Sequence, residues 1–214
     1  MFIITISYII QRLIGKIQNA PLVAQSSISA QQKTAKGGAE AKKIALVATF
    51  IALGVALSIY PGSIPIGPTK VFPFQHMING ILGVALGPWY AAAAALAIGL
   101  LRISIGTGTI FALPGGIPGA LVVGLLHRYV HKSSWFSLTE PVGTGIGALL
   151  SASVVAPIIH AAPIPAAAWA WLGLTAQWQL FLAAFLASSI PGAALGFIVV
   201  VALEKRGVLA KISV

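Results

Sequence analysis

The amino-acid sequence predicts an all-α integral membrane protein, a bundle of six transmembrane helices whose two termini lie on the cytoplasmic side. Hydrophobic residues make up 58% of the chain and charged residues 7%, whereas a soluble domain carries roughly 25% charged residues. Backbone groups inside a bilayer must be hydrogen-bonded within the protein, and the chain lacks the alternating pattern of barrel strands, so helices are expected. Each apolar stretch approaches the roughly 20 residues that cross a hydrocarbon core. The expected spans are residues 44–60, 71–87, 89–106, 110–130, 141–161 and 179–203.

The positions of the basic residues predict the orientation of these spans. The chain carries a net charge of +10, and basic residues gather at the cytoplasmic ends of membrane spans. The basic groups at span ends fall on one side of the membrane only if the number of spans is even and both termini are cytoplasmic. This distribution predicts a multi-pass protein of the cell (plasma) membrane and no nucleic-acid partner. The groups are Lys42 with Lys43, Arg128 with Lys132, and Lys205 with Arg206 and Lys211.

The segments around the bundle differ from it in composition. Apolar residues recur every three or four positions in residues 1–19, which is typical of an amphipathic helix on the inner leaflet, although an extension without a role fits equally well. Residues 20–41, rich in Ala, Gln, Ser, Lys and Gly, are expected to form a flexible linker. The predicted organisation is therefore an N-terminal extension (1–41), a transmembrane domain (42–206) and a short cytoplasmic tail (207–214).

Small residues four positions apart indicate where helices approach each other closely in a membrane. Four glycine pairs have this spacing, and an alanine stripe has it on the first span. Any one pair is weak evidence in a chain with 23 glycines. The glycine pairs are Gly83/Gly87, Gly115/Gly119, Gly143/Gly147 and Gly192/Gly196, and the stripe is Ala48, Ala52 and Ala56.

The connection between the first two spans is predicted to be stiff and non-helical. Residues 61–70 hold three prolines and two glycines, and proline both fixes its own backbone and removes a hydrogen-bond donor. A surface connector would suffice to explain this segment. We favour a lid over an outward-facing pocket, because polar residues continue directly below it in the second span.

The candidate pocket combines that lid with polar residues at the outer ends of the second and third spans. His76 and Asn79 lie on one helical face, and Gln75 is four positions from Asn79. Burying such groups without a partner costs roughly 2–7 kcal/mol, so they must bond to each other, to a neighbouring helix or to a ligand. Arg102 could either extend outwards to the surface or point into the same cavity. The predicted substrate-binding residues are Lys70, Gln75, His76, Asn79, Arg102, Thr107 and Thr109, with Phe72, Phe74 or Phe111 as an apolar wall.

Several chemistries are disfavoured by what the sequence lacks. There is no cysteine, no Gly-x-x-x-x-Gly-Lys-Ser/Thr motif and no cluster with metal-ligand spacing, so we predict no metal, no cofactor and no catalytic residues. The chain has no aspartate and three glutamates. Glu140 is explained as the first acid of a helix, after Thr139 as N-cap and before Pro141, with an ion pair to Arg128 as a further possibility. The chain is therefore predicted not to be an enzyme.

Three segments together resemble a known family. They are Gly67-Pro-Thr-Lys-Val-Phe-Pro-Phe-Gln-His-Met-Ile-Asn-Gly-Ile-Leu-Gly-Val-Ala-Leu-Gly-Pro-Trp-Tyr90, Gly106-Thr-Gly-Thr-Ile-Phe-Ala-Leu-Pro-Gly-Gly-Ile-Pro-Gly-Ala120 and Leu138-Thr-Glu-Pro-Val-Gly-Thr-Gly145. They resemble the ThiW family of substrate-binding S components of energy-coupling-factor (ECF) transporters. The similarity covers about residues 42–205 and rests on long ordered strings of residues rather than on hydropathy.

The resemblance implies a six-helix subunit that binds a thiamine precursor, the hydroxyethylthiazole moiety, from outside. It also implies a separate transmembrane coupling subunit and two ATPase subunits, which would use the ATP that drives uptake. Family members dock on the coupling subunit through small residues of the first helix, and Ala48, Ala52 and Ala56 match them. The alternative is an autonomous secondary transporter or channel for a small polar solute. We consider it weaker because proton-coupled carriers place a titrating carboxylate in the membrane, and no glutamate is expected there.

Overall fold

The structure, a computed structural model, describes four parts of the chain, and these parts belong to two compact units. The units are residues 1–42 and residues 43–214. The described parts are residues 22–60, 62–66, 69–158 and 177–212.

In the first unit the described residues are helical. They form the N-terminal part of α2 (Leu22–Ile59), so the prediction of a flexible linker over residues 20–41 is wrong from Leu22 onward. The reason is intrinsic preference, because Ala, Gln and Lys are good helix formers and outweigh the scattered Ser and Gly. The amphipathic helix expected in residues 1–19 lies outside the described residues.

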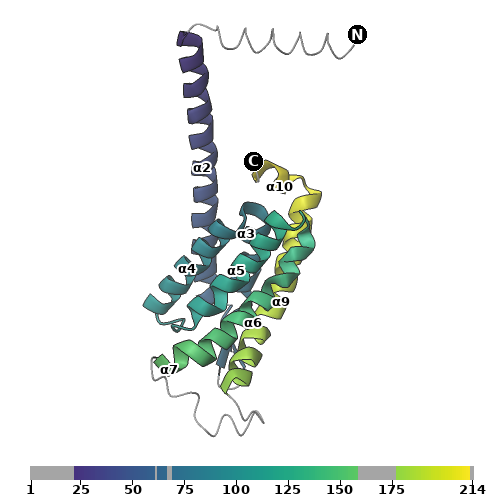
Figure 1. Cartoon of the computed structure of the whole chain (residues 1–214). Coiled ribbons are helices and arrows are strands. Elements are labelled where there is room, and N and C mark those ends of the chain that lie inside the picture. Colours follow the sequence, from purple (N-terminus) through teal and green to yellow (C-terminus); the bar gives the residue numbers. More distant parts are fainter. Residues whose placement is uncertain (1–21, 61, 67–68, 159–176, 213–214) are drawn as a thin grey trace. The chain divides into compact units, whose positions relative to one another are not determined.

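In the second unit each of the predicted apolar stretches contains helix, and successive helices run in alternating directions (Figure 1). Among the described residues, three helical segments are long and apolar enough to cross a membrane: Gln31–Ile59, Ser134–Val155 and Trp178–Lys205. The all-α membrane class is therefore confirmed. The elements after α2 are α3 (Pro73–Leu86), α4 (Pro88–Ser104), α5 (Ala112–Tyr129), η1 (Ser134–Thr139), α6 (Glu140–Leu150), η2 (Ser151–Val155), α7 (Ala156–Ile158), α9 (Gln177–Lys205) and α10 (Val208–Ile212).

Helix α3 lies at the centre of this unit. It packs against α4, α5 and α9, and Ile78 and Leu82 on it are completely buried. Its 14 residues extend about 21 Å at 1.5 Å per residue, less than the roughly 30 Å of a hydrocarbon core. A one-residue turn at Gly87, whose φ of 86° suits glycine, connects α3 directly to α4. The central helix is thus positioned to carry side chains toward three neighbours at once.

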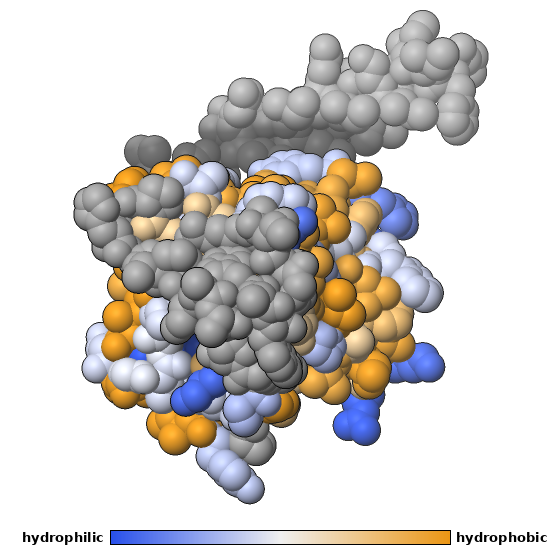
Figure 2. Space-filling model, turned by 90° about the horizontal axis from the view of Figure 1, so that it is seen from below, coloured by the Kyte–Doolittle hydropathy of each residue, from blue (hydrophilic) through white to orange (hydrophobic). Residues whose placement is uncertain are grey.

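The exterior of the second unit is apolar while polar side chains face inward. On α6, Val142, Ile146 and Leu149 are exposed, whereas Glu140 and Thr144 on the opposite side are completely buried. Figure 2 shows hydrophobic residues over much of the described surface in that view, with groups of hydrophilic residues between them. A soluble helix has the reverse arrangement. This inversion is what a lipid-facing surface requires.

The glycine spacing predicted from sequence does mark close helix contacts. Gly143 and Gly147 of α6 lie directly against the backbone carbonyls of Pro118 and Pro114 in α5, where an added Cβ would overlap. Gly192 of α9 lies in the same way against Pro73 of α3. These contacts bring α6 close to α5, and α9 close to the central helix α3.

The connection between α2 and α3 is a short hairpin. Strands β1 (Ile64–Ile66) and β2 (Thr69–Val71) pair antiparallel, with Ile64 opposite Val71, which confirms that this segment is not helical. Val71 is buried, and the backbone N–H of Phe72 donates to Ser188 Oγ of α9 at 3.1 Å. The second strand is therefore held against α9, at the end of α3 where its polar residues begin.

Candidate binding site

The third, fourth and seventh residues of α3 bring three polar side chains into the interior. Gln75, His76 and Asn79 are 4%, 7% and 1% exposed, so none of them faces lipid. Their spacing places them along one side of the helix, where they meet α4, α5 and α6. Because buried polar groups require partners, the neighbours of these three residues define the site.

Glu140 of α6 is the centre of the resulting network. It is 0% exposed, and its Oε1 accepts hydrogen bonds from Asn79 Nδ2 at 3.0 Å and from Thr144 Oγ1 at 3.0 Å. His76 Nδ1 lies 2.7 Å from the same oxygen. The second carboxylate oxygen of Glu140, Oε2, is also buried and has no partner among the described residues. One carboxylate oxygen is thus shared by three neighbours, while the other has none within the part of the chain that the structure describes.

The glycine-rich start of α5 makes room for this carboxylate. An added Cβ at Gly119 would overlap the carboxylate of Glu140 and come within 2.7 Å of Thr144 Oγ1. The carbonyl of Gly115 accepts from Thr144 Oγ1 at 3.1 Å, and that of Gly116 accepts from Asn79 Nδ2 at 3.0 Å. Because these three residues of α5 are glycines, the backbone of α5 at this point is accessible to the polar groups of α3 and α6.

Arg102 of α4 and Gln75 of α3 form a second buried polar pair at the hairpin end of the site. The Arg102 side chain is 3% exposed, and its Nη1 donates to Gln75 Oε1. Its Nη2 lies 3.4 Å from the carbonyl oxygen of Thr107. The guanidinium also stacks on the ring of Phe72, 3.7 Å from the ring centroid. Of the two orientations left open by the sequence, the structure has the inward one.

Two of the predicted site residues lie apart from this network. Lys70 on β2 and Thr109 after α4 are both exposed. Thr107 is half-buried, and its Oγ1 lies 3.3 Å from Ser58 Oγ of α2. The structure therefore brings together Gln75, His76, Asn79 and Arg102, places Thr107 at their edge, and leaves Lys70 and Thr109 at the surface.

The aromatic residues proposed as an apolar wall have different positions. Phe72 lies against Arg102, as described above, and Phe74 packs beside Gly62 of the hairpin. Phe111 makes an edge-to-face contact with Phe181 of α9, with ring centroids 4.8 Å apart. Of these three aromatic side chains, Phe72 is the one that contacts a polar residue of the site, Arg102.

The sequence interpretation of Glu140 is confirmed for its position, because Thr139 is the N-cap of α6, Glu140 lies in the first turn and a proline follows. Three details differ. Thr139 makes no capping hydrogen bond at the start of α6, and its hydroxyl donates instead to the Phe136 carbonyl at 2.7 Å. Arg128 is exposed, with its guanidinium 5.6 Å from the ring centroid of Tyr129, rather than paired with Glu140. Glu140 also lies inside the apolar segment Ser134–Val155, so the expectation of no acid within the membrane fails. The signal available in the sequence was its spacing of four from Thr144.

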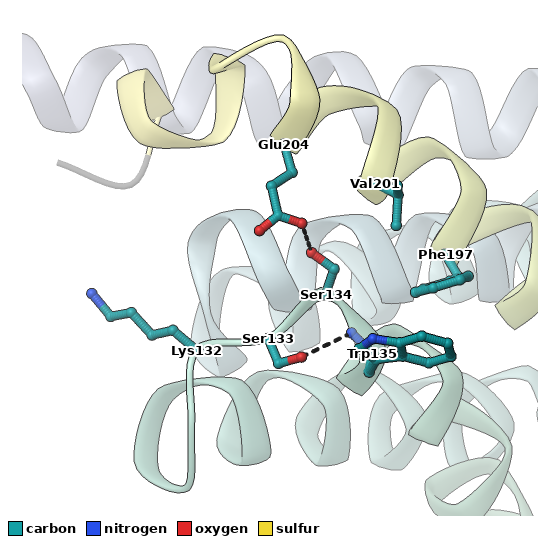
Figure 3. Close-up of a pocket in the computed structure, with 7 residues that line it drawn as sticks. All are labelled: Lys132, Ser133, Ser134, Trp135, Phe197, Val201 and Glu204. Carbon is teal, nitrogen blue, oxygen red and sulfur yellow. Dashed lines mark hydrogen bonds between the residues drawn. The ribbon is translucent and has the colours of Figure 1, made fainter.

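A separate pocket of about 380 Å³ lies at the other end of α9, next to η1 (Figure 3). There the hydroxyl of Ser134 donates to Glu204 Oε2, and the rings of Trp135 and Phe197 lie 4.7 Å apart. The pocket is lined by Lys132, Ser133, Ser134, Trp135, Phe197, Val201 and Glu204.

The buried network within an apolar exterior defines a class, a helical membrane protein with an internal polar site. A protein-family comparison gives the particular family. The profile of ThiW, described as thiamine-precursor transporter protein, matches residues 44–206, which is most of the chain, and the chain therefore belongs to the ThiW family. A search of curated proteins finds no significant match. The family is one of transporter proteins, so the resemblance to ThiW found in the sequence is confirmed and the chain belongs to a family of transport proteins.

Proposed function

We propose that the chain is the substrate-binding S component of an ECF-type importer, and that it captures hydroxyethylthiazole from outside the cell. The observation that carries this proposal is the buried network of Gln75, His76, Asn79, Arg102 and Glu140 in a member of a thiamine-precursor transporter family. The network begins one turn below the hairpin that connects α2 to α3. The hairpin is well placed to act as the lid of that site.

In this proposal the chain crosses the plasma membrane six times, with both termini in the cytoplasm. Each of the six apolar stretches contains helix, and successive helices run in alternating directions (Figure 1), which supports an even number of crossings. The exposed Arg128 and Lys132 at the end of α5, and the exposed Lys205 and Arg206 at the end of α9, support the same orientation.

The formal charges of the network suit a neutral ligand. The sequence suggested two cations in the pocket, Lys70 and Arg102, which would favour a phosphorylated or carboxylated precursor. Lys70 is exposed on the hairpin, and the buried guanidinium of Arg102 is accompanied by the buried carboxylate of Glu140. A neutral thiazole alcohol, which needs hydrogen bonds and an aromatic surface such as Phe72, matches this composition better than an anion does.

The energy for transport would come from partner proteins. We propose a transmembrane coupling subunit and two ATPase subunits that use ATP, while this chain itself holds no cofactor. Ala48, Ala52 and Ala56 are exposed along one stripe of α2. Small side chains at that spacing allow close approach of another membrane helix, which makes this stripe the proposed docking surface for the coupling subunit.

Calorimetry on the purified chain tests the proposal. Hydroxyethylthiazole is expected to bind at micromolar concentrations, whereas thiamine and the pyrimidine precursor are expected to bind more weakly. Co-expression with an ECF module should then be required for uptake of radiolabelled thiazole by whole cells. If the folded protein does not bind hydroxyethylthiazole, the proposed substrate is wrong.

The pair formed by His76 and Glu140 favours a second candidate, an autonomous proton-coupled carrier. Buried carboxylate and imidazole groups inside a bundle are the usual parts of a proton relay, and here they lie 2.7 Å apart. Proteoliposomes that contain only this chain distinguish the two functions. Accumulation of thiazole driven by a proton gradient would support the carrier, whereas binding without accumulation would support the S component.

A further inference from the structure

We infer that Glu140 is the group that selects the ligand, by accepting a hydrogen bond at Oε2 from the ligand's hydroxyl group. This inference rests on the proposed function and deepens it. It assigns the specificity to Glu140, which was not among the binding residues predicted from the sequence. It also gives the chemical class of the ligand, a neutral molecule that carries a hydrogen-bond donor.

The first step in the argument is the asymmetry of the carboxylate. Oε1 accepts hydrogen bonds from Asn79 Nδ2 and Thr144 Oγ1 and lies 2.7 Å from His76 Nδ1. This oxygen therefore already connects α3 to α6. Oε2 is buried and has no partner among the described residues. An ionised carboxylate offers about four acceptor positions. If Glu140 served only to hold helices together, there would be no need for its second oxygen to remain unpaired.

The second step is that Asn79 presents an acceptor of the same kind. Its Nδ2 donates to two oxygens, the Gly116 carbonyl and Glu140 Oε1, each at 3.0 Å. Both partners are acceptors only, so they fix the orientation of the amide. The Oδ1 of Asn79 is then the remaining atom, and it too is buried without a partner among the described residues.

These two atoms belong to residues that are hydrogen-bonded to each other, so the site offers two neighbouring acceptors. A molecule that presents a donor satisfies them, whereas one that presents only acceptors does not. Unpaired acceptors in the interior are unfavourable. A site built to bond a hydroxyl group therefore rejects an analogue that lacks it more strongly than an apolar pocket would.

The experiment combines two ligands with two proteins. The ligands are hydroxyethylthiazole and ethylthiazole, which differ by the hydroxyl group, and the proteins are wild type and Glu140→Gln, each full-length. Gln keeps the shape and the helix-side acceptor but replaces one carboxylate oxygen by a donor. Wild type should bind the alcohol roughly 10- to 100-fold more tightly than ethylthiazole, the range expected for a hydrogen bond to a charged group. Glu140→Gln should remove most of that preference, so that the ratio of the two affinities falls toward one.

A matched control lies further along the same chain segment. Ser151 is completely buried, and its hydroxyl donates within its own helical segment to the Gly147 carbonyl at 2.8 Å. Ser151→Ala should leave both affinities and their ratio unchanged.

The outcomes separate this inference from the proposed function. If wild type binds neither thiazole, the proposed substrate is wrong. If wild type binds the alcohol but Glu140→Gln weakens both ligands equally, or neither, then Glu140 acts on the fold or on a bound water and the inference is overturned.

A second measurement keeps the inference testable if Glu140→Gln does not fold. The chain has only three acidic side chains, so its carboxylate infrared bands are few. In the Glu40→Gln/Glu204→Gln background, Glu140 is the one remaining side-chain carboxylate. Hydroxyethylthiazole should shift its stretching band and ethylthiazole should not. Identical difference spectra for the two ligands would refute direct contact.

Discussion

Glu140 and Glu204 show how differently this protein uses the same side chain at two places. Glu140 is 0% exposed and has His76, Asn79 and Thr144 around one oxygen. Glu204 is exposed at the end of α9, where it accepts a hydrogen bond from Ser134 beside an open pocket (Figure 3). The comparison teaches that a carboxylate becomes part of the interior only where several helices supply donors to it.

The strongest way to break this comparison is to remove each carboxylate in turn. Glu140→Leu removes the buried carboxylate that joins His76 and Asn79 of α3 to Thr144 of α6, and it should lower the free energy of unfolding by about 3–5 kcal/mol. Glu204→Leu at the exposed site should change it by no more than about 0.5 kcal/mol. Thermal unfolding in detergent, followed by tryptophan fluorescence, measures both. Equal losses for the two variants would show that the network around Glu140 does not hold the bundle together.

The features that the sequence predicted correctly are those that depend on local pattern. Apolar stretches gave the helices, because length and hydropathy suffice for them, and the spacing of His76 and Asn79 gave the inward face of α3. Residues 61–70 contain too many prolines for a helix. The central position of α3 was not predicted, because an apolar run does not reveal whether its neighbours are lipid or protein.

The features that were missed depend on contacts between distant residues. Thr139-Glu140-Pro141 has the same pattern as an ordinary helix start, and only the approach of α3 and α5 turns Glu140 inward. Arg102 and Lys70 are both cations near the hairpin, yet one lies against Phe72 and Gln75 while the other is exposed. Nothing in the local sequence separates these outcomes, because tertiary packing decides them.

The two cations near the hairpin sharpen the comparison. Arg102→Ala should lower the free energy of unfolding by about 2 kcal/mol, since it leaves buried Gln75 Oε1 without a donor and removes the contact with Phe72. It should also weaken thiazole binding. Lys70→Ala should alter neither quantity measurably, because that side chain is exposed. Paired unfolding and calorimetry experiments check this, and a large effect of Lys70→Ala on affinity would place the hairpin lysine in the binding site.

The space opposite Glu140 can be tested by adding a single methyl group. Gly119→Ala would bring a Cβ into the carboxylate of Glu140, and overpacking of this kind costs about 1–3 kcal/mol. Gly145→Ala on α6 is the control, because its Cβ would lie 3.6 Å from Leu182 Cδ1, an ordinary contact. The difference in unfolding temperature between the two variants measures the effect. If the two unfold alike, the carboxylate has more freedom than its packing suggests.

The smallest effect is expected at the pocket beside Glu204. Trp135 is 67% exposed, and its ring lies 4.7 Å from that of Phe197. Trp135→Ala should therefore cost about 0.5–1.5 kcal/mol of stability from the lost aromatic pair. It should leave the affinity for thiazole unchanged, because none of the hydrogen bonds around Glu140 among the described residues involves Trp135. Calorimetry on Trp135→Ala and Phe197→Ala distinguishes the two regions. The pocket and the buried network have separate hydrogen-bond partners, so neither variant should lose affinity for thiazole. A loss of affinity in both variants would mean that the pocket and the network act as one site.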